Sequence, residues 1–167
     1  RGQSAAIAAL EEAVKDPGKS GDYILLVGKP GCGKTMLARR LTTILPVLTM
    51  AEAREVAAVQ SAAGLLDDDL SSLPSHPFRA PHSSITATGM LGISATSRPG
   101  EVSLAHHGIL YLDDVEEFTG AVLRMLASVL RDGTVRVGTH PTLPARPALV
   151  VAAVSDGSER ARRQRAA

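Results

Sequence analysis

Short apolar runs alternate with segments of helical spacing along this chain of 167 residues. Continuously apolar runs predict buried strands, and apolar residues repeated every three or four positions predict helices. Strands buried on both faces are typical of a parallel sheet covered by helices, so we expect an α/β fold. The predicted strands cover 23–27, 108–112 and 148–154, and the predicted helices cover 4–14, 36–45, 50–63, 101–105 and 119–131.

Three stretches are less regular. Residues 67–81 contain three consecutive aspartates and then three prolines, which predicts an irregular, turn-rich segment. Residues 85–96 mix small, polar and apolar residues around Gly89 and Gly92, which predicts a hairpin or loop insertion. A short strand is predicted over 134–138.

The sequence GKPGCGKT follows the first strand directly and has the phosphate-binding pattern G-x-x-x-x-G-K-[ST]. Glycines let the backbone curl so that several N–H groups point inward, and the following helix adds the positive end of its dipole. We expect Lys34 to reach the β- and γ-phosphates of ATP and the Thr35 hydroxyl to bind Mg²⁺. The predicted nucleotide-binding residues are Gly28, Lys29, Pro30, Gly31, Cys32, Gly33, Lys34, Thr35 and Met36.

Two carboxylates follow the second predicted strand. Asp113 and Asp114 come directly after Ile109–Leu112, at the end of the strand where open α/β sheets bind ligands. A P-loop enzyme needs one carboxylate beside Mg²⁺ and a second group that orients the attacking water. We assign the metal to Thr35 and Asp113, and to Asp114 the role of catalytic base or water-positioning group; the alternative is an acidic turn after a strand.

Composition excludes several classes of protein. Hydrophobic residues make up 44% but aromatics only 2%, which argues against a platform that stacks single-stranded bases. A net charge of +1 gives no general attraction to nucleic acid or membranes. One cysteine forms no internal disulfide and fits a reducing compartment. No apolar run is long enough to span a bilayer, so a cytoplasmic location without membrane contact is expected.

Several long segments extend this interpretation. They read HPFRAPHSS over 76–84, RPGEVSLAH over 98–106, GILYLD over 108–113 and PARP over 144–147. In order and content they resemble magnesium chelatase-like AAA+ ATPases, and most closely their ComM/YifB branch. The resemblance extends from residue 2 to about residue 154.

The resemblance implies a three-layer AAA+ core that uses ATP and Mg²⁺ within a homo-oligomeric ring, expected to be a hexamer. ComM-type relatives remodel DNA by branch migration, whereas chelatase relatives drive metal insertion into a tetrapyrrole. The insertion at 85–97 is expected to face the ring interior and contact the substrate. We expect the core to cover 1–157 and a basic tail, the start of a truncated segment, to cover 158–167.

The chain also departs from this family pattern. Asp114 stands where the family usually has glutamate, and Ser155, the expected γ-phosphate sensor, stands in place of asparagine. The segments for the trans arginine finger and helical lid are missing from the sequence. These differences leave open a nucleotide-binding module with little hydrolysis.

Other polar residues are weaker candidates. Oxidation of Cys32 would block phosphate binding, although a small residue at a variable P-loop position is the simpler interpretation. His82 either contacts the nucleotide or the pore of the ring, or packs structurally. Arg146 acts on a neighbour's nucleotide or, as we prefer, forms a salt bridge at a strand edge. The histidines have no zinc-binding spacing, and the tail arginines are expected to be solvated.

Overall fold

The structure is a computed structural model that describes residues 23–65, 75–93, 98–136 and 142–154. The helix predicted over 4–14, Ser155 and the basic tail lie outside these residues. None of the helices in the described part of the chain has the length and apolar character needed to cross a membrane.

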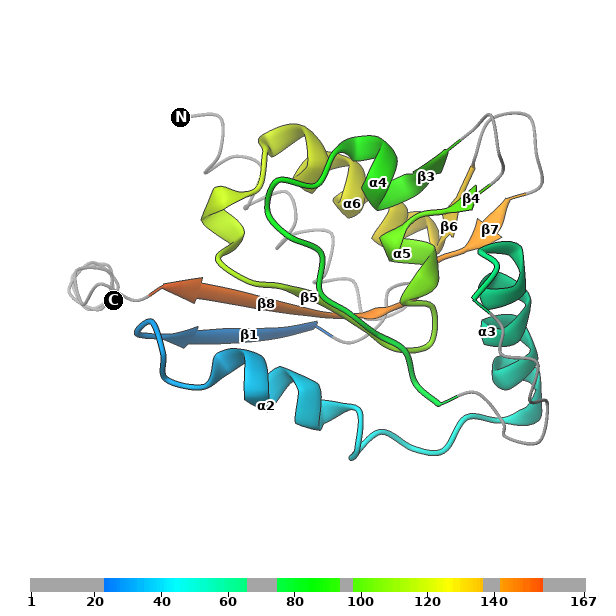
Figure 1. The fold of residues 1–167 in the computed structure, drawn as a ribbon, viewed down its shortest axis with the longest axis horizontal. Helices are drawn as coiled ribbons and strands as arrows, with labels where there is room; N and C mark the ends of the chain where they lie inside the picture. The colour runs from blue at the N-terminus through cyan, green and yellow to red at the C-terminus, as the bar shows by residue number, and fades with distance from the viewer. Residues whose placement is uncertain (1–22, 66–74, 94–97, 137–141, 155–167) are drawn as a thin grey trace.

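A four-stranded parallel sheet forms the centre of the molecule (Figure 1). Its strands lie in the order β1 (Tyr23–Gly28), β8 (Ala148–Val154), β5 (Ile109–Leu112) and β2 (Phe78–Arg79). Strand β8, which follows the other three along the chain, therefore lies between β1 and β5. Because all four strands are parallel, the loops that leave β1 and β5 emerge at the same end of the sheet.

Helices cover both faces of the sheet, as the α/β prediction requires (Figure 1). On one face α2 (Lys34–Leu41) buries Ala38 against Ile109, Tyr111 and Ala152. On the other, α6 (Gly120–Asp132) provides most of the larger core, with α4 (Ala87–Leu91) and α5 (Glu101–Leu104) beside it. The remaining elements are α3 (Met50–Ala62), the 3-10 helix η2 (Val115–Glu117) and two hairpins, β3 (Gly92–Ile93) with β4 (Arg98–Pro99) and β6 (Thr134–Val135) with β7 (Leu143–Pro144).

The ends of the two long helices follow from local side-chain chemistry. Thr49 and Glu52 form a capping box at the start of α3, in which each side chain bonds the other residue's backbone N–H. Thr119 caps α6, and Gly133 ends it in the left-handed conformation at φ 66°. The start of α3 and both ends of α6 were predicted from the sequence.

The helix after the P-loop is shorter than predicted. It ends at Leu41 and not near Leu45. The Thr42 and Thr43 hydroxyls donate to the carbonyls of Arg39 and Arg40, at 2.8 and 2.7 Å. Such local bonds, made by β-branched residues a few positions before a proline, compete with continuation of the helix.

The prediction that β1 is buried on both of its faces was wrong. Leu25 and Val27 are 38% and 54% exposed, whereas Ile24 and Leu26 pack towards α2. Among the described residues β1 is an edge strand, and α4, α5 and α6 cover the sheet further along. An apolar run therefore did not distinguish a central strand from an edge strand.

The irregular stretches contain more structure than predicted. The segment expected to be irregular over 67–81 includes β2, which pairs with β5. The proposed insertion begins with α4, capped by Thr86, and only its second part pairs as a hairpin, β3 with β4. Strand β7 was not predicted. Tertiary pairing decides the conformation of such two-residue strands, and local pattern does not.

Candidate functional site

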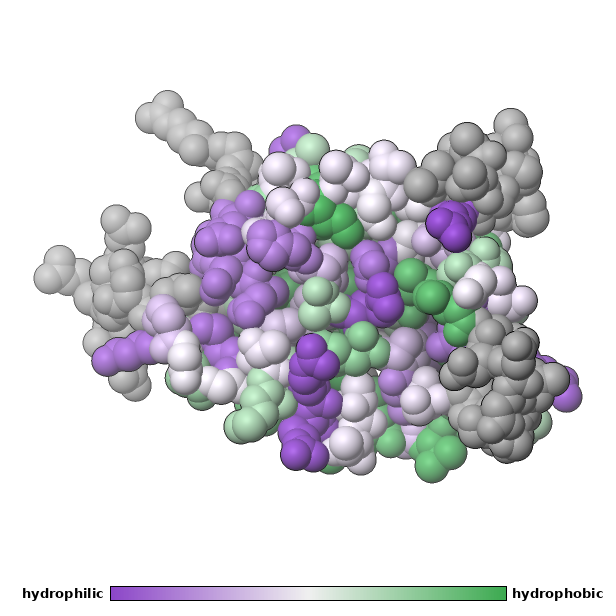
Figure 2. Space-filling model, viewed as in Figure 1, coloured by the Kyte–Doolittle hydropathy of each residue, from purple (hydrophilic) through white to green (hydrophobic). Residues whose placement is uncertain are grey.

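A cleft lies at the carboxyl end of the sheet, beside the segments that follow β1 and β5. Its volume is about 300 Å³. Figure 2 shows hydrophilic residues gathered over η2 and the adjoining end of the sheet. The cleft is lined by Thr35, Ala80, Pro81, His82, Ser83, Tyr111, Asp113, Asp114 and Glu117.

The P-loop connects β1 to α2 through two glycines with positive φ, Gly31 at 75° and Gly33 at 88°. Residues with a Cβ adopt this conformation at a cost, so glycine suits both positions, although the pattern itself requires it only at Gly33. The Lys34 ammonium donates to the carbonyls of Gly28 and Lys29, at 3.1 and 3.4 Å, and therefore lies against the loop. The Cys32 side chain is exposed and free.

The P-loop and the end of β5 are joined by a direct hydrogen bond. Thr35 Oγ1 donates to Asp113 Oδ2 at 3.0 Å, across 78 positions of sequence. Tyr111, on β5, donates its phenolic proton to Asp113 Oδ1, also at 3.0 Å. Burial raises the pKa of Tyr111 to about 12, so this phenol remains a donor. A hydroxyl and a carboxylate side by side are oxygen ligands of the kind that Mg²⁺ takes.

A second pair of carboxylates borders the cleft. Asp114 is half-buried and has φ 48°, the left-handed conformation that aspartate tolerates better than most residues. Glu117 of η2 accepts a hydrogen bond from the Ser83 hydroxyl at 3.0 Å. Tyr111, Ser83 and Glu117 were not predicted as site residues, because nothing in the local sequence distinguishes them from their neighbours.

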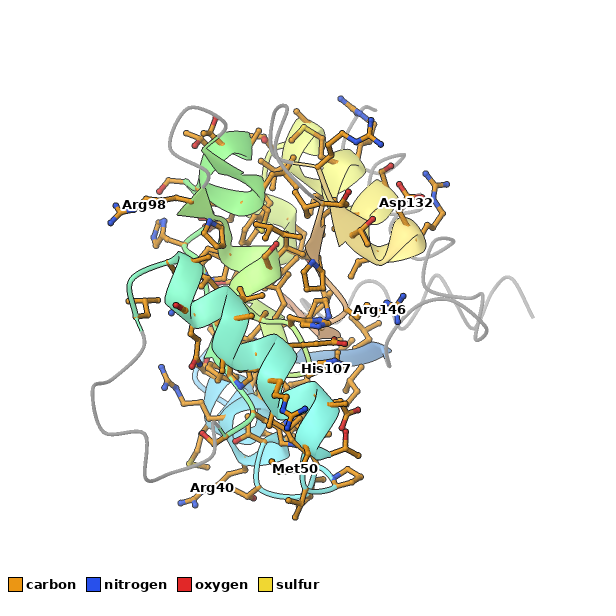
Figure 3. The ribbon with its side chains drawn as sticks, turned by 90° about the vertical axis from the view of Figure 1, so that its right-hand side faces the viewer. Arg40, Met50, Arg98, His107, Asp132 and Arg146 are labelled. Carbon is orange, nitrogen blue, oxygen red and sulfur yellow. The ribbon has the colours of Figure 1, made fainter. Side chains whose placement is uncertain are left out.

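The other candidates lie in several places. Met36 is 68% exposed on α2 and does not line the cleft. His82 lines it, and its Nδ1 bonds with the Ser84 hydroxyl and backbone N–H. Arg146 lies near the opposite end of the sheet, beside His107 (Figure 3). Its side chain packs over Gly133, and among the described residues no salt bridge supports the strand-edge interpretation.

A second polar cluster ties α3 to the amino ends of β5 and β8, and Figure 3 looks onto it through α3. Glu55 accepts from His106 Nε2 and His107 Nε2, at 2.8 and 2.9 Å. The pKa of Glu55 is lowered by these two hydrogen bonds. His106 is 1% exposed, and burial lowers its pKa despite the bond to Glu55. His107 adopts φ 54°, a turn that is uncommon for residues other than glycine.

Glu55, His106 and His107 place three potential metal-binding atoms within 4.8 Å of one another. The proton positions disfavour a metal. His106 Nδ1 accepts from the Arg146 N–H at 3.2 Å, so the proton of the neutral ring is on Nε2, the atom that a cation would need. Both ring nitrogens of His106 have partners within the protein, and the cluster connects α3 to the start of β5. Glu55 lies 51 positions before His106, and spacing along the sequence alone did not reveal this contact.

The fold and the cleft together define a P-loop NTPase of the AAA+ class. Solved structures share the arrangement. The BchI–BchD complex of magnesium chelatase aligns with a TM-score of 0.61 and 22% identity, over 89% of this chain and 50% of that one. NtrX from Brucella abortus in complex with ATP aligns with a TM-score of 0.57 and 19% identity, over 95% and 32%.

The chain belongs to the magnesium chelatase family, since the family described as magnesium chelatase, subunit ChlI, matches residues 1–165. An uncharacterised protein of Mycobacterium tuberculosis is 42% identical over 91% of this chain. YifB of Escherichia coli is 42% identical over 79%, and the competence protein ComM of Haemophilus influenzae is 42% identical over 77%. The chain spans 26–30% of the length of these relatives.

Proposed function

We propose that this domain binds ATP with Mg²⁺ and hydrolyses it to drive the remodelling of DNA, within a cytoplasmic homo-oligomeric ring, expected to be a hexamer. One observation carries the nucleotide part. The hydroxyl of Thr35, at the start of the P-loop helix, bonds to the carboxylate of Asp113 at the end of β5. In a P-loop enzyme these two groups together would hold one Mg²⁺ ion.

Each residue then has a defined role. Backbone N–H groups of residues 28–36, other than Pro30, would surround the phosphates at the amino end of α2. Lys34 would exchange its carbonyl partners for the β- and γ-phosphates. Thr35 and Asp113 would hold the Mg²⁺ shell, and Asp114 would orient water. Ser155, which lies outside the described part of the chain, would act as the γ-phosphate sensor.

Similarity to a named relative supports the DNA part of the proposal. The competence protein ComM is 42% identical to this chain over 134 residues. The alternative, a motor subunit for metal insertion into a tetrapyrrole, draws on the family description and on the fold shared with the BchI–BchD complex. The higher identity to ComM favours the DNA role, and assays of a longer protein that contains this domain separate the two.

A Lys34→Ala variant tests nucleotide binding. Removing a cation that bonds directly to phosphates should cost about 1.5–3 kcal/mol, or roughly 10–100-fold in affinity. The measurement is titration with a fluorescent ATP analogue in the presence of Mg²⁺. Arg40→Ala, a change at an exposed residue of the same helix, is the control and should bind normally. Equal affinity in all three proteins would contradict the proposal.

The DNA part has its own test. In a longer protein containing this domain, Lys34→Ala should abolish branch migration of a DNA junction. Migration at the wild-type rate in that variant would leave nucleotide binding without a role in DNA remodelling. Metal insertion into a tetrapyrrole by the same protein with partner subunits would favour the alternative.

A module that binds nucleotide but hydrolyses it slowly is the second candidate. The observation that favours it is Asp114, whose side chain is one methylene shorter than the usual glutamate and lies on a left-handed backbone. The shorter side chain withdraws the carboxylate by about 1.3 Å. A displacement of about 1 Å can reduce a catalytic rate by the order of 10²-fold.

A further inference from the structure

The phenol of Tyr111 lies at the junction of the two Mg²⁺-side groups. Its hydroxyl is 3.0 Å from Asp113 Oδ1 and 3.3 Å from Thr35 Oγ1. The residue is 1% exposed, yet its hydroxyl reaches the wall of the cleft. Asp113 follows the last residue of β5 and comes two positions after Tyr111, so strand alternation brings both side chains to the same side.

We propose that Tyr111 is a positioning residue for Mg²⁺, which fixes the Asp113 carboxylate and leaves the Thr35 oxygen free to bind the ion. This role rests on the proposed function, because it concerns the same ATP·Mg²⁺ site. Tyr111 does not contact the ion itself and acts through the Asp113 carboxylate.

Proton positions lead to this role. The ionised Asp113 carboxylate is an acceptor only, and each hydroxyl has a single proton. Tyr111 gives its proton to Oδ1, and Thr35 gives its proton to Oδ2. Both oxygens of the carboxylate are then fixed in orientation, and the lone pairs of Thr35 Oγ1 remain available to a cation. Without the phenol, the carboxylate would be held by Thr35 alone and could rotate.

The ring is held firmly enough for this task. Tyr111 stacks on Phe78 of β2 with ring centroids 6.0 Å apart and an interplanar angle of 26°. The Arg39 guanidinium lies 5.0 Å from the centroid of the Phe78 ring. The phenolic oxygen therefore extends from a packed layer between α2 and the sheet. Groups that orient metal ligands in this way typically change metal affinity by about 10–100-fold when removed.

Tyr111→Phe removes the hydroxyl and keeps the ring, so it tests the role with little change in packing. The experiment titrates Mg²⁺ into the whole chain mixed with a fluorescent ATP analogue and measures the Mg²⁺ concentration at half-maximal binding. We expect this concentration to rise by about 10-fold or more in the variant. Affinity measured in EDTA should be equal in the two proteins, because the phenol contributes nothing without the ion.

A second background distinguishes positioning from general damage. If Tyr111 acts through Asp113, adding Tyr111→Phe to Asp113→Ala should cause no additional loss of Mg²⁺ response. An equal loss in both backgrounds, or superimposable Mg²⁺ titrations of wild type and Tyr111→Phe, would overturn the role alone. If nucleotide affinity is the same with and without Mg²⁺, and is unchanged by Lys34→Ala, the proposed function is overturned and this role with it.

Discussion

Two polar clusters lie at opposite ends of the same sheet and are built by different rules. At the carboxyl ends of β1 and β5, Thr35, Tyr111 and Asp113 meet beside an open cleft. At the amino ends of β5 and β8, Glu55 accepts from His106, which in turn accepts from the backbone of Arg146. Both clusters join distant parts of the chain, but only the first borders the cleft described for nucleotide.

The two clusters differ in the hydrogen-bonding and metal-binding capacity that remains on their side chains. Thr35 retains oxygen lone pairs next to the cleft, a feature that suits a cation. His106 has both ring nitrogens engaged by internal partners, a feature that suits stability. Convergence of polar residues is therefore insufficient evidence for a ligand site, and the remaining hydrogen-bonding capacity decides between the two interpretations.

Asp114→Glu should have the largest effect, a change in ATPase rate, and it alters only the cluster at the carboxyl ends of β1 and β5. Restoring the missing methylene should raise the single-turnover ATPase rate by up to about 10²-fold if the shorter side chain limits the reaction. Equal rates would mean that Asp114 already suffices. The left-handed backbone favours aspartate over glutamate, so a small loss of unfolding free energy should accompany the change.

Glu55→Ala should affect stability and spare the nucleotide site. It leaves the buried His106 Nε2–H without its partner, which should lower the unfolding free energy by about 1–3 kcal/mol. Urea denaturation measures this loss, and ATP affinity should remain at the wild-type value. Arg54→Ala, at the neighbouring exposed position of α3, is the control. A loss of ATP affinity with unchanged stability would reverse the roles assigned to the two ends.

Lowering the pH should gradually reduce the stability contributed by the His106 cluster at the amino ends of β5 and β8. Burial lowers the pKa of His106 below the unfolded value, so the unfolded chain binds the extra proton first. The stabilisation is present above the unfolded pKa, near 6.5, and is lost as pH falls through the lowered pKa. The slope from this one group is at most about 1.4 kcal/mol per pH unit.

His106→Gln isolates that contribution, because glutamine has no titrating ring and can still donate to Glu55. Unfolding should be measured on both proteins between pH 7.5 and pH 5. The variant should lose less stability over this range than the wild type. Parallel pH profiles would show that His106 does not titrate as its burial requires.

Local signals in the sequence predicted much of the fold and half of the cleft. The glycine pattern before Lys34 placed the P-loop, and the apolar run before Asp113 placed β5 with its carboxylate at the correct end. Thr49 and Glu52 predicted the start of α3 through a capping box. In each case a few adjacent residues contain the whole physical reason, so no knowledge of distant contacts was needed.

What the sequence did not predict depends on contacts between distant positions. Strand β2 exists because Phe78 and Arg79 pair with β5, which lies about 30 positions further along the chain. Glu55 and His106 became a pair only when α3 packed near the start of β5. Tyr111 read as one more apolar strand residue, and only its distances to Thr35 and Asp113 indicate a role.

The position of β8 has a consequence for biosynthesis. It lies between β1 and β5, although it follows both along the chain. While the ribosome is still making the segment before Ala148, β1 has no strand of the described sheet to pair with. Such long-range pairing slows folding and exposes strand edges in nascent chains. The phosphate loop should therefore become ordered only after synthesis has passed β8.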